Sequence, residues 1–161
     1  MDVKNPVHTV GTYRLERAEQ TALMLVLGAL VLWHWREVDW WKAIIAFWTI
    51  DILGYLPGAI VYRRQHGGAI PPIYHHLYNF AHTYLAVGAV VAVWWLVSGP
   101  EWAMLAGPFH LALDRGVFGN IFKPVALPFE PVAAPDVWQQ LMAPQEQAGV
   151  RRSSAGHGLS S

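Results

Sequence analysis

Residues 75–97 read HHLYNFAHTYLAVGAVVAVWWLV and contain no Asp, Glu, Lys or Arg. A helix that crosses the hydrocarbon core of a bilayer needs about 20 mostly apolar residues, so this stretch predicts a transmembrane helix. Three further windows, at about 15–35, 41–62 and 101–118, qualify as well, although the first and the last are more polar. We expect an all-α polytopic membrane protein, a compact four-transmembrane-helix bundle with short loops.

The composition indicates a lipid environment. Of the 161 residues, 54% are hydrophobic and only 14% are charged, against about 25% charged in ordinary soluble domains. Several of the nine tryptophans, among them Trp33, Trp40 and Trp94, lie at the edges of apolar runs, where indole rings favour the headgroup region. The lipid bilayer is therefore the expected partner. Nucleic acid is not, because the formal net charge is zero and no basic stripe is present.

The chain divides into two predicted parts. Residues 1–123 form the four-helix transmembrane domain, and residues 124–161 form a Pro-rich, partly disordered cytoplasmic tail. Five prolines between residues 124 and 144 exclude a long helix there. Residues 136–142 are expected to form a short interfacial helical turn, with Asp136 as its cap.

The basic residues predict the orientation in the membrane. Of the eleven Lys and Arg, only Arg36 and Lys42 fall on the side opposite the N-terminus. Cytoplasmic loops carry the excess of Lys and Arg, so we expect a bacterial inner-membrane protein with both termini in the cytoplasm. A homo-oligomer or a larger membrane complex is left open.

Several polar residues within these apolar windows are candidates for a functional site, because ionisable groups inside a membrane are costly. In chain order they are Glu16, Glu19, Asp51, His75, His76, Asn79, His82, His110 and Asp114. With a rise of ~1.5 Å per residue, the deeper of them lie roughly 6–16 Å below the cytoplasmic surface. Spacings of three, four and seven residues place each set on one helical face. We expect the four helices to bring these faces together in the cytoplasmic leaflet.

Two imidazoles with one or two carboxylates suit a divalent zinc, iron or manganese ion. The chain has no Cys, so thiolate ligands are excluded. We predict that His82, His110 and Asp114 bind the metal. Asp51 is a further ligand, or it orients one of the imidazoles.

Such a metal could hydrolyse an ester, because it lowers the pKa of a bound water to about 7 and polarises a phosphoryl or carbonyl oxygen. The depth of the site suits a lipid headgroup ester or another amphiphile. Asp51 is one candidate catalytic carboxylate, and Glu16 or Glu19 is the candidate general acid or base. Arg115 is expected to anchor its helix end at the headgroups. The secondary candidates for the site are His75, His76 and Asn79.

Two other classes of function stay open. His82 and His110 lie at matching depths on consecutive antiparallel helices, where the axial ligands of a b-type haem in a redox subunit could sit. Alternatively, the polar cluster handles protons, or it only ties four helices together in a non-catalytic membrane subunit.

Four segments resemble an uncharacterised family of small four-helix bacterial integral membrane proteins, over about residues 13–123. They are Arg14-Leu15-Glu16, Asp51-Ile52-Leu53-Gly54-Tyr55, Tyr78-Asn79-Phe80-Ala81-His82 and His110-Leu111-Ala112-Leu113-Asp114-Arg115. The resemblance implies the same polar residues but no established activity. This chain departs from the family at Ile50, where a Pro is usual, and at residues 116–120, where a Gly-Tyr-Gly stretch is expected.

The order of an Asp, a His-containing segment and a His followed four residues later by Asp is also loosely similar to membrane-bound metal-dependent hydrolases of bacterial inner membranes. This similarity implies metal-assisted hydrolysis of a membrane-associated substrate, by analogy of pattern.

Overall fold

Every regular element in residues 10–130, the part of the chain that this computed structural model describes, is helical. The elements are α1 (Val10–Trp33), α2 (Trp40–Gly54), α3 (Leu56–Arg64), α4 (Pro72–Ala81), α5 (Tyr84–Ser98), η1 (Trp102–Leu105), α6 (Ala106–Leu113) and η2 (Asp114–Phe118). The first short element, η1, is a 3-10 helix, and η2 is a π-helix. The predicted all-α class is confirmed.

The prediction of four uninterrupted helices is wrong. The second window forms α2 and α3, bent by 41°, and the third forms α4 and α5, bent by 53°. The last window is a succession of η1, α6 and η2, while the first helix begins earlier than expected, at Val10. Within residues 10–130, no single helix has both the length and the apolar character needed to cross a membrane, whereas each of the two bent pairs meets both criteria when taken together.

Local chemistry explains both breaks. Pro57 lies in the first turn of α3, where it has no N–H to donate to the carbonyl of Leu53, four residues earlier, and its ring crowds that carbonyl. At the second break, Thr83 has an extended backbone (φ −101°, ψ 142°), and its Oγ1 accepts a hydrogen bond from the Ala86 N–H at 3.0 Å. A threonine N-cap begins a new helix. The chain therefore ends α4 at Ala81 and starts α5 at Tyr84.

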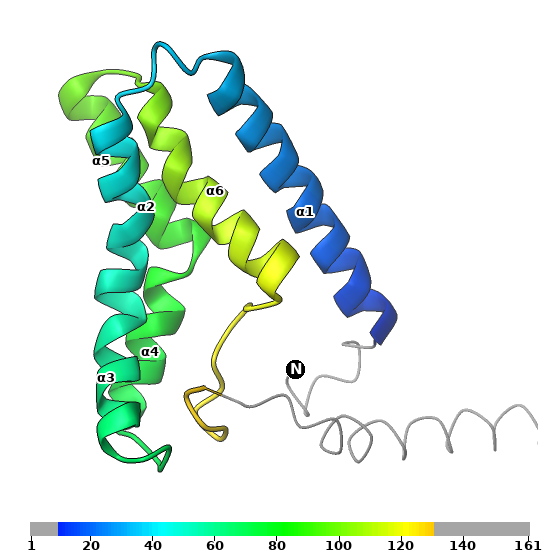
Figure 1. Cartoon of the computed structure of the whole chain (residues 1–161), viewed down its shortest axis with the longest axis vertical. Coiled ribbons are helices and arrows are strands. Elements are labelled where there is room, and N and C mark those ends of the chain that lie inside the picture. The colour runs from blue at the N-terminus through cyan, green and yellow to red at the C-terminus, as the bar shows by residue number, and fades with distance from the viewer. Residues whose placement is uncertain (1–9, 131–161) are drawn as a thin grey trace, which may run out of the picture. The chain divides into compact units, whose positions relative to one another are not determined.

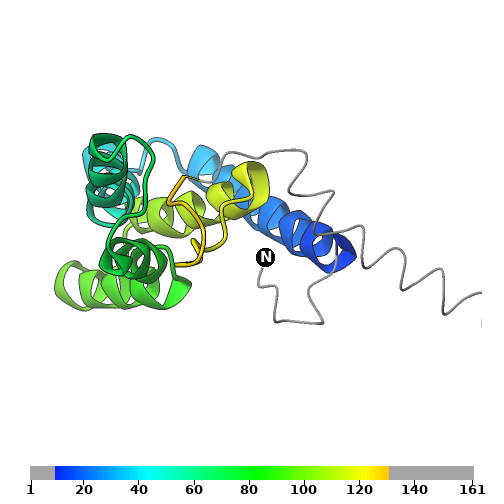
Figure 2. The same ribbon diagram turned by 90° about the horizontal axis from the view of Figure 1, so that it is seen from below.

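Helix α6 lies at the centre of the bundle. Both α1 and α2 pack against it, and Figure 1 shows α6 between them. Figure 2 shows α1 on one side of α6 and the pairs α2–α3 and α4–α5 on the other. Leu111 and Ala112 of α6 are 1% and 0% exposed, so this helix carries the centre of the core.

Two glycines permit close contacts that position the helices around α6. A Cβ on Gly54, the last residue of α2, would lie 2.7 Å from the Cβ of Ala81 on α4. A Cβ on Gly116, in η2, would lie 2.7 Å from the backbone nitrogen of Thr21 on α1. Both distances are shorter than packed carbon and nitrogen atoms allow. The sequence thus needs glycine at both positions.

Residues 120–130, here called the strap, follow η2 and lie against α3 and α4. The side-chain amide of Asn79 donates to the Lys123 carbonyl at 3.0 Å, and its Oδ1 accepts from the Lys123 N–H at 2.7 Å. Phe129 is 0% exposed and packs directly on Gly58 of α3, where any Cβ would overlap its ring. The strap is therefore a packed part of the helical unit.

The helical unit extends further along the chain than the predicted boundary after residue 123. Residues 10–130 belong to one compact unit. The remainder of the predicted tail, and the interfacial turn predicted at residues 136–142, lie outside the described residues.

Replacing Gly54 by Ala is expected to destabilise the protein by about 1–3 kcal/mol, because the added Cβ would lie 2.7 Å from Ala81 Cβ and 3.1 Å from the His82 ring. Gly88→Ala is the matched control, since nothing lies within 4 Å of its added Cβ and alanine favours a helix over glycine by ~1 kcal/mol. Unfolding of both variants in mild detergent measures the difference. Equal effects would contradict the close contact of α2 with α4.

Candidate metal centre

Two histidines and two aspartates from four different elements meet at one point. Asp51 lies on α2, His82 is the C-cap of α4, His110 lies on α6, and Asp114 is the first residue of η2. One nitrogen or oxygen atom from each of the four lies within 4.8 Å of all the others. These four residues, here called the quartet, are the same four that the sequence analysis selected as metal ligands. Together they are able to hold a metal ion.

The imidazoles and carboxylates alternate around the centre. His82 Nε2 lies 3.3 Å from Asp51 Oδ1 and 3.5 Å from Asp114 Oδ2. His110 Nε2 lies 3.6 Å and 3.7 Å from the same two oxygens. Each nitrogen therefore faces both carboxylates, and each carboxylate faces both imidazoles.

The spacing of these atoms fits a metal ion. Zinc binds His nitrogen at about 2.0–2.1 Å and carboxylate oxygen at about 2.0–2.2 Å, so neighbouring ligand atoms of a tetrahedral site lie about 3.3–3.6 Å apart. The four nitrogen–oxygen separations in the quartet run from 3.3 to 3.7 Å. Hydrogen bonds between nitrogen and oxygen usually measure about 3.2 Å or less. Three of the four separations are longer than this by 0.3 Å or more, so direct hydrogen bonds explain the arrangement poorly.

The hydrogen bonding of the rings also favours a cation. His82 Nδ1 lies 3.0 Å from the Tyr78 carbonyl and donates to it, which leaves the lone pair of a neutral ring on Nε2. Neither ring nitrogen of His110 has a hydrogen-bond partner among residues 10–130. Lone pairs facing carboxylates repel them, so the centre requires either a metal ion or extra protons on the rings.

The walls of the centre are apolar, and only the carboxylate side reaches the surface. The ring of Tyr78 stacks on His82 with centroids 3.9 Å apart, and Phe47 meets His110 edge-on at 4.6 Å. The side chains of His82 and His110 are 2% and 3% exposed, whereas those of Asp51 and Asp114 are 29% and 15% exposed. A substrate could therefore approach past the carboxylates, and Asp51 is the most accessible member.

Arg115 holds the broken helix in place, and the prediction that it anchors a helix end at the headgroups is wrong. The residue is only 9% exposed, and its Nη2 donates to the His82 carbonyl at 2.9 Å. The break after α4 has freed that carbonyl from the helix. The guanidinium also lies over the rings of Tyr84 and Phe122, at 4.8 and 5.3 Å. No pattern in the sequence indicates this role, because it depends on the break.

The other predicted site residues lie outside the quartet. Glu16 is half-buried and Glu19 is exposed on α1, and neither belongs to the group of ligand atoms. His75 is buried, with Nε2 3.2 Å from the Leu127 carbonyl of the strap, and His76 is exposed. Like Asn79, therefore, His75 contacts the strap.

Lys123 is a further cation beside the site that sequence reasoning missed. Its Nζ donates to the Phe129 carbonyl at 2.5 Å and lies 4.9 Å from the centre of the Tyr78 ring. Burial lowers the pKa of Lys123, while the carboxylates of Glu130 and Asp114 act in the opposite direction. The strap thus carries a partly buried positive charge beside the tyrosine that supports His82.

The geometry does not favour the haem alternative. The rings of His82 and His110 are 5.8 Å apart and tilted by 56°. A porphyrin held between them would overlap the carboxylates, which lie 3.3–3.7 Å from the same ring nitrogens. A single small ion avoids this overlap.

Arg115→Met is expected to lower the free energy of unfolding by about 1–3 kcal/mol, because it leaves the His82 carbonyl buried without a donor. Arg63→Met makes the same chemical change at an exposed position on α3 and should stay within about 0.5 kcal/mol of the parent. Denaturant titration of both proteins measures the effect. A loss at Arg115 no larger than at Arg63 would count against the capping role.

Comparison of the chain with protein-family models, with curated proteins and with solved structures gives no match. The function is therefore inferred from the quartet and its surroundings.

Proposed function

We propose that this chain is an integral membrane hydrolase in which the quartet binds one divalent zinc, manganese or iron ion and cleaves an ester of a membrane-associated amphiphile. The observation that carries the proposal is the alternation of two His Nε2 atoms and two Asp oxygens at 3.3–3.7 Å. The dry, apolar walls around the imidazoles support it, because a low dielectric strengthens every charge interaction inside.

The surface of the helices supports a membrane location. On α5, Leu85, Leu96 and Val97 are 82%, 86% and 81% exposed. Large contiguous apolar surface on a soluble monomer is rare, whereas lipid tails cover such side chains without cost. In this proposal the two bent pairs cross the bilayer and both termini face the cytoplasm of a bacterial inner membrane.

A divalent ion held by the quartet would supply a nucleophilic water near neutral pH and polarise the ester oxygen. His82 and His110 are the buried ligands, and the hydrogen bond from His82 Nδ1 to the Tyr78 carbonyl orients its ring toward the ion. Asp114 is the less exposed carboxylate ligand. Asp51, the most exposed member, would bind the ion through Oδ1, which faces both imidazoles, and its other carboxylate oxygen would accept the proton from the attacking water as general base.

The donor set leaves room for substrate. Two imidazoles and two carboxylates would fill four positions, so a manganese or iron ion that takes six ligands would still accept both a water and the ester oxygen. Zinc, by expanding to five ligands, would accept one of the two at a time.

Detergent-purified protein is expected to contain close to one metal ion per chain, and Asp51→Asn and His82→Ala should each lower the metal affinity by at least about tenfold. His76→Ala removes an exposed histidine outside the quartet and should leave the affinity unchanged. Elemental analysis after dialysis against a weak chelator measures this. Asp51→Asn conserves size at a partly exposed position, so its result stands even if His82→Ala fails to fold. A folded, metal-free parent protein would favour the structural or proton-handling cluster.

The metal-loaded protein is also expected to hydrolyse phospholipid in mixed micelles, with Asp51→Asn reducing turnover by about 10²–10⁴-fold through loss of the base. Mass spectrometry of the lipid products separates cleavage of the acyl ester from cleavage of the phosphoester. His76→Ala serves again as the active control. Metal-loaded protein without turnover on either bond would contradict the hydrolase assignment while leaving the metal site intact.

A further inference from the structure

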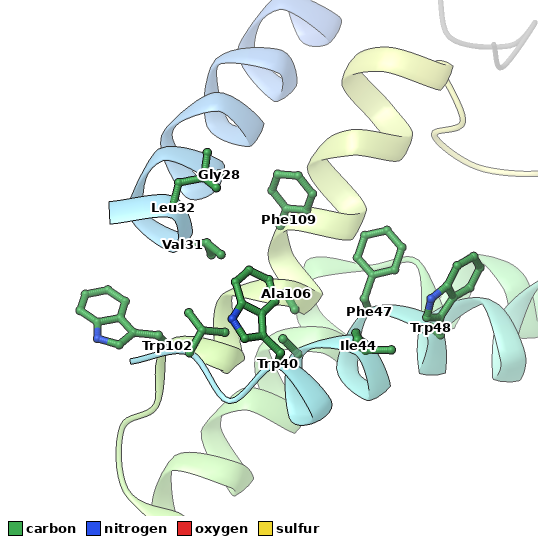
Figure 3. Close-up of a pocket in the computed structure, with 12 residues that line it drawn as sticks. Gly28, Val31, Leu32, Trp40, Ile44, Phe47, Trp48, Trp102, Ala106 and Phe109 are labelled. Atoms are coloured by element: carbon green, nitrogen blue, oxygen red, sulfur yellow. The ribbon is translucent and has the colours of Figure 1, made fainter. Parts of the chain in front are cut away.

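A hollow of about 370 Å³ lies between α1 and α2, and Figure 3 shows its lining. Almost every group that faces it is apolar. Its lining residues include Gly28 and Val31 of α1, Ile44 and Phe47 of α2, and Ala106 and Phe109 of α6. This hollow is here called the groove.

The packing of the bundle explains why the groove exists. Both α1 and α2 pack on α6, so the two outer helices form walls and α6 forms the floor through Ala106 and Phe109. Gly28 lets α1 approach α6 closely at this point, because a Cβ there would lie only 3.2 Å from the Phe109 ring. The remaining volume of about 370 Å³ suits a slender apolar group.

One end of the groove lies about one helical turn from the quartet. On α2 the lining residues Ile44, Phe47 and Trp48 follow a helical stripe, and the next position of that stripe, three residues after Trp48, is Asp51. Phe47 also touches the metal centre directly, with its ring 4.6 Å from the ring of His110. A linear apolar group that lies in the groove would therefore direct one end toward Asp51, the most accessible member of the quartet.

The opposite end is closed by two fixed indoles. Trp40 Nε1 donates to the Trp35 carbonyl at 3.1 Å, and Trp102 Nε1 donates to the Glu37 carboxylate at 3.0 Å. The Trp102 ring also stacks on His34 at 3.7 Å. From Trp40 to Asp51 the helix rises ~16 Å, which sets a finite length for the occupant.

A second apolar hollow, of about 500 Å³, lies on the other face of α2. It is lined by the opposite stripe of α2, through Ile45, Thr49 and Leu53, and by α4 and α5. No member of the quartet lines either hollow, but the ring of Phe47, which lines the groove, contacts His110. The second hollow therefore serves as an internal comparison for the groove.

We propose that the groove binds the single linear acyl chain of the substrate, with the scissile ester at Asp51 and the chain end near Trp40 and Trp102. The assignment rests on the proposed metal-dependent hydrolysis and names its substrate class, an amphiphile with an unbranched chain of limited length. The contact of Phe47, a lining residue of the groove, with the ring of His110 carries the proposal.

The test uses n-alkyl hydroxamic acids, whose chelating head binds a divalent ion and whose tail probes the groove. Affinity is measured by calorimetry on metal-loaded protein in micelles, from acetohydroxamic acid upward. Each added methylene should tighten binding by up to about fourfold, until the tail reaches the two indoles and the gain stops. Ile44→Trp, at a groove position that is 47% exposed, should abolish the gain while acetohydroxamic acid still binds.

Ile45→Trp is the matched control, because the neighbouring residue is 63% exposed and lines the other hollow. It should keep the full dependence on tail length. Partition of long tails into micelles affects all three proteins equally, so the comparison between them isolates the groove. The same gain in Ile44→Trp as in the parent would overturn the groove assignment and leave the metal site standing. Failure of acetohydroxamic acid to bind the parent would instead overturn the metal chemistry, and the groove assignment with it.

Discussion

The burial of two imidazoles between two carboxylates is the constraint on which the surrounding structure depends. Charged groups taken out of water are costly unless they are paired or bind a metal, so the quartet needs helices held at fixed separations. Gly54 lets α2 approach the end of α4, where His82 lies. Arg115 then satisfies the carbonyl that the broken helix exposes, and the stacked ring of Tyr78 excludes water from behind. Each of these contacts stabilises a polar group that would otherwise be too costly to bury in the core.

The two helix breaks lie close to the ligands, and this placement has a physical reason. Asp51 is four residues before the break at Tyr55, and His82 is the residue that ends α4. Near a helix end the backbone has groups without helical partners, so side chains and distant residues are drawn there to satisfy them. The π-helix that begins at Asp114 is a third irregular element of this kind, and such turns often occur at functional sites. The ligands therefore come from helix ends and from one regular helix, α6.

Sequence reasoning found the four members of the quartet because ionisable residues stand out in apolar windows, and their helical spacing shows which of them share a face. It missed both bends, since hydropathy does not distinguish a continuous span from two helices joined by a threonine cap. It also missed Arg115, whose role exists only once His82 has lost its helical neighbours. Glu16 and Glu19 are the opposite case, because sequence reasoning included them and the structure places them outside the quartet. The predicted depth of Glu19 matched that of Asp114, but depth along a helix leaves open how α1 is rotated and tilted against α6.

The strap connects the end of the described chain to the quartet through one aromatic ring, that of Tyr78. Tyr78 stacks on His82 on one side and meets Phe129 of the strap at 6.1 Å on the other. Ordering of His82 by a ligand and docking of the strap are therefore linked, and such coupling is reciprocal. Loosening of His82 would therefore expose residues 120–130 more often as an extended segment that proteases can cleave.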